Sequence, residues 1–155
     1  MAELLTYDED TAFMLADDAA TISAIVRRTP VEKLRAHKVG DWTAVEVIGH
    51  LADGSEIFAD RVGRCIEEEQ PTLRAFDQDR LARDRRNAER DPMELSRRLQ
   101  RAHQQIVQLL QRPGATLRTG VHTQLGVVTA GHCGAYEAKH AHEHTLELAK
   151  AFPPS

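Results

Sequence analysis

Apolar residues recur three or four positions apart along four stretches of the chain, and this spacing constrains the fold more than any other feature. Such spacing places the apolar side chains on one face of an α-helix. The stretches are residues 8–28, 43–68, 91–112 and 128–151. Aromatic residues make up only 5% of the chain, whereas β-strands favour aromatic and β-branched side chains. The sequence therefore predicts an all-α protein.

Local signals mark where these helices begin and end. Thr43 followed by Glu46 fits a capping box, in which the two side chains satisfy free backbone N–H groups at a helix start. Asp91-Pro92 combines an N-cap residue with a proline at the first helical position. Proline stops the first, third and fourth helices, at Thr29-Pro30, Pro113-Gly114 and Pro153-Pro154.

The connections between the helices predict how they are arranged. Residues 69–91 contain many charges and little apolar periodicity, so we expect a long crossover with a short exposed helix. Residues 115–126 are expected to form a loop. A long crossover lets the two helices that it joins lie parallel. Residues 1–155 are therefore predicted to form one domain, a four-helix bundle with a long crossover between the second and third helices.

The charge of the chain argues against several classes of partner. Its formal net charge is -4, so no overall positive field attracts nucleic acid or an anionic membrane. The basic run "RLARDRRNAER" is interleaved with acidic residues and is expected to be a solvated surface. Only two cysteines, Cys65 and Cys133, occur, and no leader or membrane-spanning apolar run is present. We expect a cytoplasmic protein with reduced thiols.

Three histidines alternate in the stretch "KHAHEHTLEL" near the end of the chain. On a helix, residues four apart lie on one face, whereas residues two apart point to nearly opposite sides. His140 and His144 therefore form a pair able to clasp one metal ion, and His142 is expected to stay off the metal. Periodicity does not decide which face of this helix is buried, because apolar residues occupy both.

A metal site with an open position needs a third imidazole. His50 lies on the predicted inward stripe of the second helix, and a bundle builds metal sites from facing helices. The alternative is that these histidines only pack or form hydrogen bonds. Asp53 and Glu56 are candidates to orient a ligand imidazole, although exposed helical carboxylates are commoner. The remaining histidines are weaker candidates for ligands: His37, His103, His122 and His132.

Two segments resemble the DinB/YfiT-like superfamily. Asp41 to Arg61 is similar to its Trp-Ser/Thr…Glu-Val…His-Leu-x-Asp segment, and the pattern from His122 through Leu125-Gly126 and Thr129 to the histidine pair resembles its loop and final helix. The resemblance covers nearly the whole chain. It implies a four-helix bundle with a metal triad of His50, His140 and His144, and it makes Trp42 a packing residue.

The resemblance implies a metal site more strongly than any one reaction. Superfamily members include thiol-dependent transferases and isomerases and a hydrolase, which leads us to expect a transferase that uses a low-molecular-weight thiol and a small electrophilic substrate. Hydrolysis by metal-bound hydroxide and a non-catalytic metal-binding or stress-response role are the alternatives. Many members carry Gln where this chain has Glu147, a candidate general base. The ion is expected to be Zn, Ni or Fe, and the superfamily suggests a homodimer.

Overall fold

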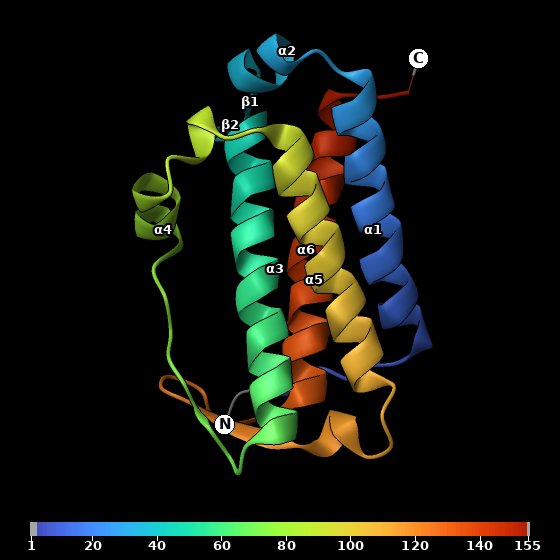
Figure 1. The fold of residues 1–155 in the computed structure, drawn as a ribbon, viewed down its shortest axis with the longest axis vertical. Coiled ribbons are helices and arrows are strands. Elements are labelled where there is room, and N and C mark those ends of the chain that lie inside the picture. Colours follow the sequence, from blue (N-terminus) through green and yellow to red (C-terminus); the bar gives the residue numbers. More distant parts are fainter. Residues whose placement is uncertain (1–2, 155) are drawn as a thin grey trace.

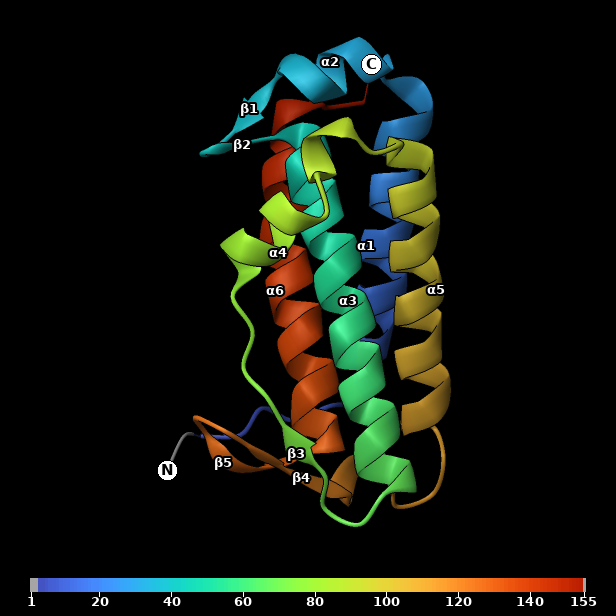
Figure 2. The same ribbon diagram turned by 60° about the vertical axis from the view of Figure 1, so that its left-hand side comes forward.

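Four long helices form the body of the protein in the computed structural model, which describes residues 3–154 (Figure 1). They are α1 (Glu9–Arg28), α3 (Ala44–Glu67), α5 (Pro92–Leu110) and α6 (Ala130–Ala151). Helices α3 and α5 run in one direction, and α1 and α6 run in the other (Figures 1 and 2). Each of α3 and α1 packs against both α5 and α6. The predicted four-helix bundle is therefore confirmed.

The helix starts follow the predicted capping signals. The backbone N–H of Thr43 donates to Oε1 of Glu46 over 3.0 Å, and the N–H of Glu46 donates back to Oγ1 of Thr43 over 3.3 Å. The N–H of Met93 donates to Oδ1 of Asp91 over 3.0 Å at the start of α5. Both caps satisfy donors that a helix start leaves free. The sequence therefore placed these two starts correctly.

The crossover joins two parallel helices, as its length predicts. It contains β3 (Thr72–Leu73), α4 (Gln78–Asp84) and the short 3-10 helix η1 (Asn87–Glu89). Helix α4 lies outside the bundle beside α3 (Figures 1 and 2). At the same end of the bundle as the start of α3, α2 (Val31–Ala36), β1 (Lys38–Val39) and β2 (Trp42–Thr43) form a cap. Strands β1 and β2 pair antiparallel.

The prediction of a loop over residues 115–126 was wrong. The segment contains the 3-10 helix η2 (Ala115–Leu117) and β4 (Thr119–His122), and β5 (Gly126–Thr129) follows. Strand β4 pairs antiparallel with β5 and parallel with β3 of the crossover. The predicted fourth helix accordingly starts at Ala130 rather than Val128. This small sheet closes the end of the bundle opposite to the cap (Figure 2).

Close packing of the crossover on α3 makes Gly49 a sensitive position. A Cβ atom there would lie 2.6 Å from Cγ of Asn87, whose side chain is buried and donates to Oδ2 of Asp53. We expect Gly49→Ala to lower the free energy of unfolding by about 1–3 kcal/mol, because Asn87 must move. Urea denaturation measures this change.

Gly54 on the same helix provides the matched control. No atom of residues 3–154 outside its own neighbourhood lies within 4 Å of a Cβ built there. Replacing Gly54 by Ala should stabilise α3 by about 0.5–1 kcal/mol, since alanine loses less backbone entropy in a helix. Equal effects of the two substitutions would contradict the packing of Asn87 against Gly49.

Candidate metal centre

Three imidazoles from two helices converge in the half of the bundle nearer the β1–β2 cap. His50 projects from α3, and His140 and His144 project from α6. The Nε2 atoms of His50 and His140 lie 3.1 Å apart, and one ring nitrogen from each of the three residues lies within 4.8 Å of the others. Within residues 3–154, no other group of His, Cys, Asp or Glu side chains converges in this way.

The buried stripe of α6 explains why the alternating histidines separate. Ala141, Thr145 and Leu148 form the centre of this stripe and are fully buried. His140 and His144 lie on the edge of the stripe that faces α3, and His142 lies on the other edge. There, Nδ1 of His142 lies 3.0 Å from the carboxylate of Asp18 on α1. The structure thus decides the buried face, which the sequence left open.

The environment of the cluster favours neutral imidazoles. Burial, with smaller contributions from the nearby His140 and His144, lowers the pKa of His50 to about 3. Burial, and secondarily His144, lowers the pKa of His140. A metal binds the neutral imidazole through a ring nitrogen lone pair. The protonation state that the bundle imposes is therefore the one that a metal ligand requires.

The geometry and the donor set fit a divalent ion. Nitrogen ligands about 2.0–2.1 Å from one tetrahedral ion lie roughly 3.3 Å from each other, and the observed separation of the His50 and His140 Nε2 atoms is 3.1 Å. Three imidazoles suit Zn, Ni or Fe. Three protein ligands also leave a coordination position for water or substrate. The three histidines therefore fit the divalent metal ion that the resemblance to the superfamily implies.

Two aromatic rings flank the histidine cluster. Trp42 packs edge-on against His50 with ring centroids 4.9 Å apart, in keeping with its expected packing role. On α6, Tyr136 stacks on His140 at 6.4 Å. The side chain of His144 keeps 24% of its surface exposed, so the cluster is open to solvent on that side.

Glu147 lies beside the cluster. Its Oε1 is 3.6 Å from Nδ1 of His144, a buried atom with no hydrogen-bond partner among residues 3–154. Carboxylates commonly accept the second ring N–H of a metal-bound histidine. This position suits an orienting contact to His144, and the proposed role as a general base stays a prediction.

Asp53 and Glu56 do not orient a ligand imidazole. The Glu56 side chain is 42% exposed, as the commoner alternative for a helical carboxylate predicts. Neither carboxylate contacts His50, because both bind Arg98 of α5. Asp53 is also buried rather than exposed, and it accepts hydrogen bonds from Asn87 and Arg85 of the crossover. Arg85 belongs to the basic run of residues 80–90, which was expected to be a solvated surface. Its contact to Asp53 corrects this expectation. These ion pairs fasten the crossover and α5 to α3.

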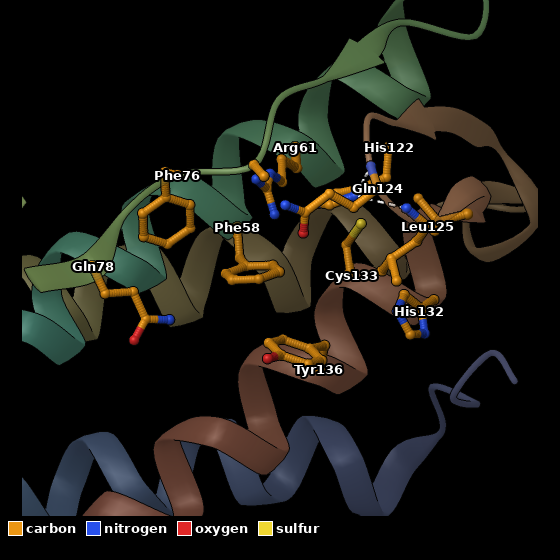
Figure 3. A pocket seen from close by; sticks show the side chains of 12 residues that line it. Phe58, Arg61, Phe76, Gln78, His122, Gln124, Leu125, His132, Cys133 and Tyr136 are labelled. Atoms are coloured by element: carbon orange, nitrogen blue, oxygen red, sulfur yellow. Dashed lines mark hydrogen bonds between the residues drawn. The ribbon is translucent and has the colours of Figure 1, made fainter. Parts of the chain in front are cut away.

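A second feature, absent from the sequence analysis, is a pocket of about 290 Å³ toward the sheet end of the bundle (Figure 3). Its walls come from α3, the crossover, the β4–β5 hairpin and the start of α6. Tyr136 lines this pocket and also stacks on His140, so the pocket adjoins the histidine cluster. No local motif in the sequence marks it, because its walls come from four separate segments. Its lining includes Phe58, Arg61, Phe76, His122, Gln124, His132 and Tyr136.

Fold and site together define a class of protein, a four-helix bundle in which two helices present three histidines to one point. The sequence model described as the DinB superfamily matches residues 14–148. The chain therefore belongs to the DinB superfamily, and the resemblance found in the sequence is confirmed. Among curated proteins, none matches the chain.

Solved structures show the same fold. YfiT from Bacillus subtilis, described as a probable metal-dependent hydrolase with an unusual four-helix bundle topology, aligns with a TM-score of 0.81 and 20% identity over 100% of this chain and 95% of YfiT. A mycothiol-dependent maleylpyruvate isomerase aligns with a TM-score of 0.71 and 12% identity over 90% of this chain and 60% of that protein. At these identities the likeness establishes the fold alone. Among residues 3–154, no helix is long and apolar enough to cross a membrane.

Proposed function

We propose that this chain is a metal-dependent enzyme in which His50, His140 and His144 hold one divalent ion. The convergence of three imidazoles around one point, open on the His144 side, supports this proposal most strongly. A divalent ion at such a site lowers the pKa of a bound thiol or water and favours its deprotonated form. The protein supplies neutral ligands, aromatic walls and an adjoining pocket.

The leading reaction is transfer of a low-molecular-weight thiol to a small electrophile. The thiol dependence of the structurally similar maleylpyruvate isomerase supports this choice. In this chain, His50, His140 and His144 would fix the position at which the thiol binds, and Tyr136 would border the space for the electrophile. The thiol proton would leave to solvent, and the sulfur would form a bond to the electrophilic carbon as that carbon releases its leaving group, a halide ion in the case of an aryl halide.

The second candidate is hydrolysis. YfiT, whose structure matches all of this chain, is described as a probable metal-dependent hydrolase. Glu147 supports this alternative, since a half-exposed carboxylate near His144 is suited to accept a proton from a nucleophilic water. Replacing Glu147 by Gln removes the basic carboxylate but keeps an oxygen able to accept the Nδ1 proton of His144, so hydrolysis should fall by about 100-fold or more while protein saturated with the ion keeps its metal.

One experiment separates these reactions. The zinc-, nickel- and iron-loaded proteins are each assayed with a thiol and an aryl halide electrophile, and with activated esters without thiol. Thiol-dependent product that disappears after chelation supports transfer, and ester cleavage that disappears after chelation supports hydrolysis. Turnover that survives complete metal removal would contradict both reactions, and a metal-loaded protein inert in every assay would favour the non-catalytic alternative.

A further inference from the structure

Arg61 is a buried cation without a carboxylate partner. Its side chain is only 7% exposed, and no carboxylate of residues 3–154 lies within ion-pair distance of it. Nη2 donates to the backbone oxygen of Arg74 over 2.6 Å. By contrast, Arg98, the other buried arginine, binds both Asp53 and Glu56. Leaving a buried charge unpaired costs free energy unless an anion compensates it.

The guanidinium of Arg61 faces the pocket beside the histidine cluster (Figure 3). Its Cζ lies 5.0 Å from the ring centroid of Phe58 and 5.5 Å from that of Phe76. These contacts hold the planar group between two aromatic side chains. Burial lowers the pKa of Arg61, yet a guanidinium stays charged in proteins. The pocket therefore contains a fixed, unneutralised positive charge.

Two histidines in the same pocket are held as hydrogen-bond donors. Nδ1 of His122 accepts the backbone N–H groups of Gln124 and Leu125 over 3.1 and 3.2 Å, and Nδ1 of His132 accepts the N–H of Leu5 over 2.9 Å. A neutral imidazole that accepts at Nδ1 carries its proton on Nε2. Burial lowers the pKa of both residues, and the charge of Arg61 adds to the effect on His122. Each ring thus offers one N–H donor.

We propose that this pocket binds the carboxylate of a small aromatic acid, with Arg61 as its counter-charge. A carboxylate matches the planar fork of donors on a guanidinium, and the rings of Phe58, Phe76 and Tyr136 offer apolar surfaces to an aromatic body. The pocket volume of about 290 Å³ suits a single ring with a short side chain. The role of this acid as a substrate rests on the function proposed above.

The position of the pocket also sets the length of the substrate. Arg61 follows His50 by eleven residues on α3, which corresponds to ~16 Å along the helix axis. Tyr136 bridges the two places, because it lines the pocket and stacks on His140. The single-ring acid therefore occupies the pocket end of the site, and a substrate that also reacts at the cluster is such an acid with its reactive group on an arm that extends past Tyr136 toward His140.

Titration of the protein with phenylacetate tests the pocket, with 2-phenylethanol as the uncharged analogue. Phenylacetate should bind at least ~10-fold more tightly than 2-phenylethanol, and Arg61→Met should remove this preference. The control is Arg64→Met, one turn further along α3, where the arginine pairs with Glu68 at the surface. This variant should bind phenylacetate as the unchanged protein does.

A thermal melt of each variant distinguishes binding from folding. Arg61→Met should melt at the same temperature or higher, because it removes an unpaired buried charge. Arg61→Lys, which keeps the charge but loses the planar fork, should bind phenylacetate several-fold more weakly than the unchanged protein. Unchanged phenylacetate binding in Arg61→Met, or no preference over 2-phenylethanol in the unchanged protein, would overturn the proposal. The proposal would also be overturned if Arg61→Met melted at a lower temperature and Arg61→Lys bound phenylacetate as tightly as the unchanged protein. Arg61 would then stabilise the fold without recognising the carboxylate through its planar fork.

The same titration on His144→Ala separates this proposal from the proposed function. Phenylacetate binding should persist in that variant, since the pocket does not include His144. If phenylacetate binds but the unchanged protein shows no metal-dependent turnover, the pocket is supported and the proposed enzymatic function is contradicted. Metal-dependent turnover with no carboxylate binding would overturn the pocket alone.

Discussion

Replacing His50 by Ala should empty the metal centre. Purified unchanged protein loaded with zinc is expected to hold about one ion per chain, and His50→Ala to hold almost none after dialysis. Removing only the group that hydrogen-bonds to a metal-bound histidine lowers metal affinity by about 10–100-fold. Removing the histidine ligand itself should therefore lower the affinity by at least ~100-fold. Metal-dependent turnover should fall with metal content. Elemental analysis and a zinc titration measure these effects.

His142 provides the matched control for this prediction. It lies two residues from His140 and from His144, yet its Nδ1 contacts Asp18 on α1. His142→Ala should therefore keep the ion with unchanged affinity, at a cost of about 1–3 kcal/mol in stability, because it leaves the buried Asp18 carboxylate without its hydrogen-bond partner. Equal loss of zinc in His142→Ala and His50→Ala would show that the alternating histidines act as one local cluster, contrary to the structure.

The second large effect is expected at His103, in the core of the bundle. Its Nε2 lies 2.6 Å from Oε2 of Glu137 on α6, and its Nδ1 lies 2.7 Å from the backbone oxygen of Leu15 on α1. Both side chains of the pair are 1% exposed. We expect His103→Ala to lower the free energy of unfolding by about 3–5 kcal/mol, because it leaves the Glu137 carboxylate buried without its partner.

Urea denaturation measures this loss, with Gln104→Ala as the control. Gln104 is the next residue of α5 and is exposed, so its replacement should change stability by less than about 0.5 kcal/mol. A loss below about 1 kcal/mol in His103→Ala, within the range of an ordinary hydrogen bond, would contradict the buried pair.

The same pair sets a direction for the pH dependence of stability. Burial lowers the pKa of His103, but hydrogen bonding and the charge of Glu137 outweigh it and raise the value above 6.5. Burial raises the pKa of Glu137 above its ordinary 4.5. With both values raised, the folded state binds more protons than the unfolded state, so the stabilising contribution falls as pH rises.

A doubly apolar variant isolates this contribution. His103→Leu/Glu137→Leu removes both titrating groups and keeps an apolar core of similar volume. The stability of the unchanged protein relative to this variant should decline as pH rises through the raised pKa of His103. A relative stability that increases with pH would contradict the direction derived for the pair.

Much of the fold was predictable because its signals are local. The caps at Thr43 and Asp91 act within one helical turn, and they fix where α3 and α5 begin. The apolar spacing sets the lengths of the helices, and the length of the crossover indicates that α3 and α5 run parallel. The small sheet was missed because β3 has only two residues and pairs with β4, some fifty residues later. Such pairing has no local signature.

The histidine cluster could be predicted from the sequence, because helix geometry divides the alternating histidines between two sides of the helix. The long-range contacts could not be predicted. The buried face of α6 was undecided since alanine and glycine populate nearly all of its sides. Asp53 looks like an exposed helical carboxylate until Arg98 and the crossover are packed against it. The missing carboxylate partner of Arg61 became apparent only in the structure, because no local pattern shows which side chains pack around it.

The central claim is that His50, His140 and His144 bind one ion across two helices, and anomalous diffraction from crystals of the zinc-loaded protein tests it most directly. We expect a single anomalous peak about 2.0–2.1 Å from one nitrogen of each of the three imidazoles, with the remaining position facing solvent and His142 turned toward Asp18. An ion held by His142, or crystals of loaded protein without an anomalous peak between α3 and α6, would contradict the claim.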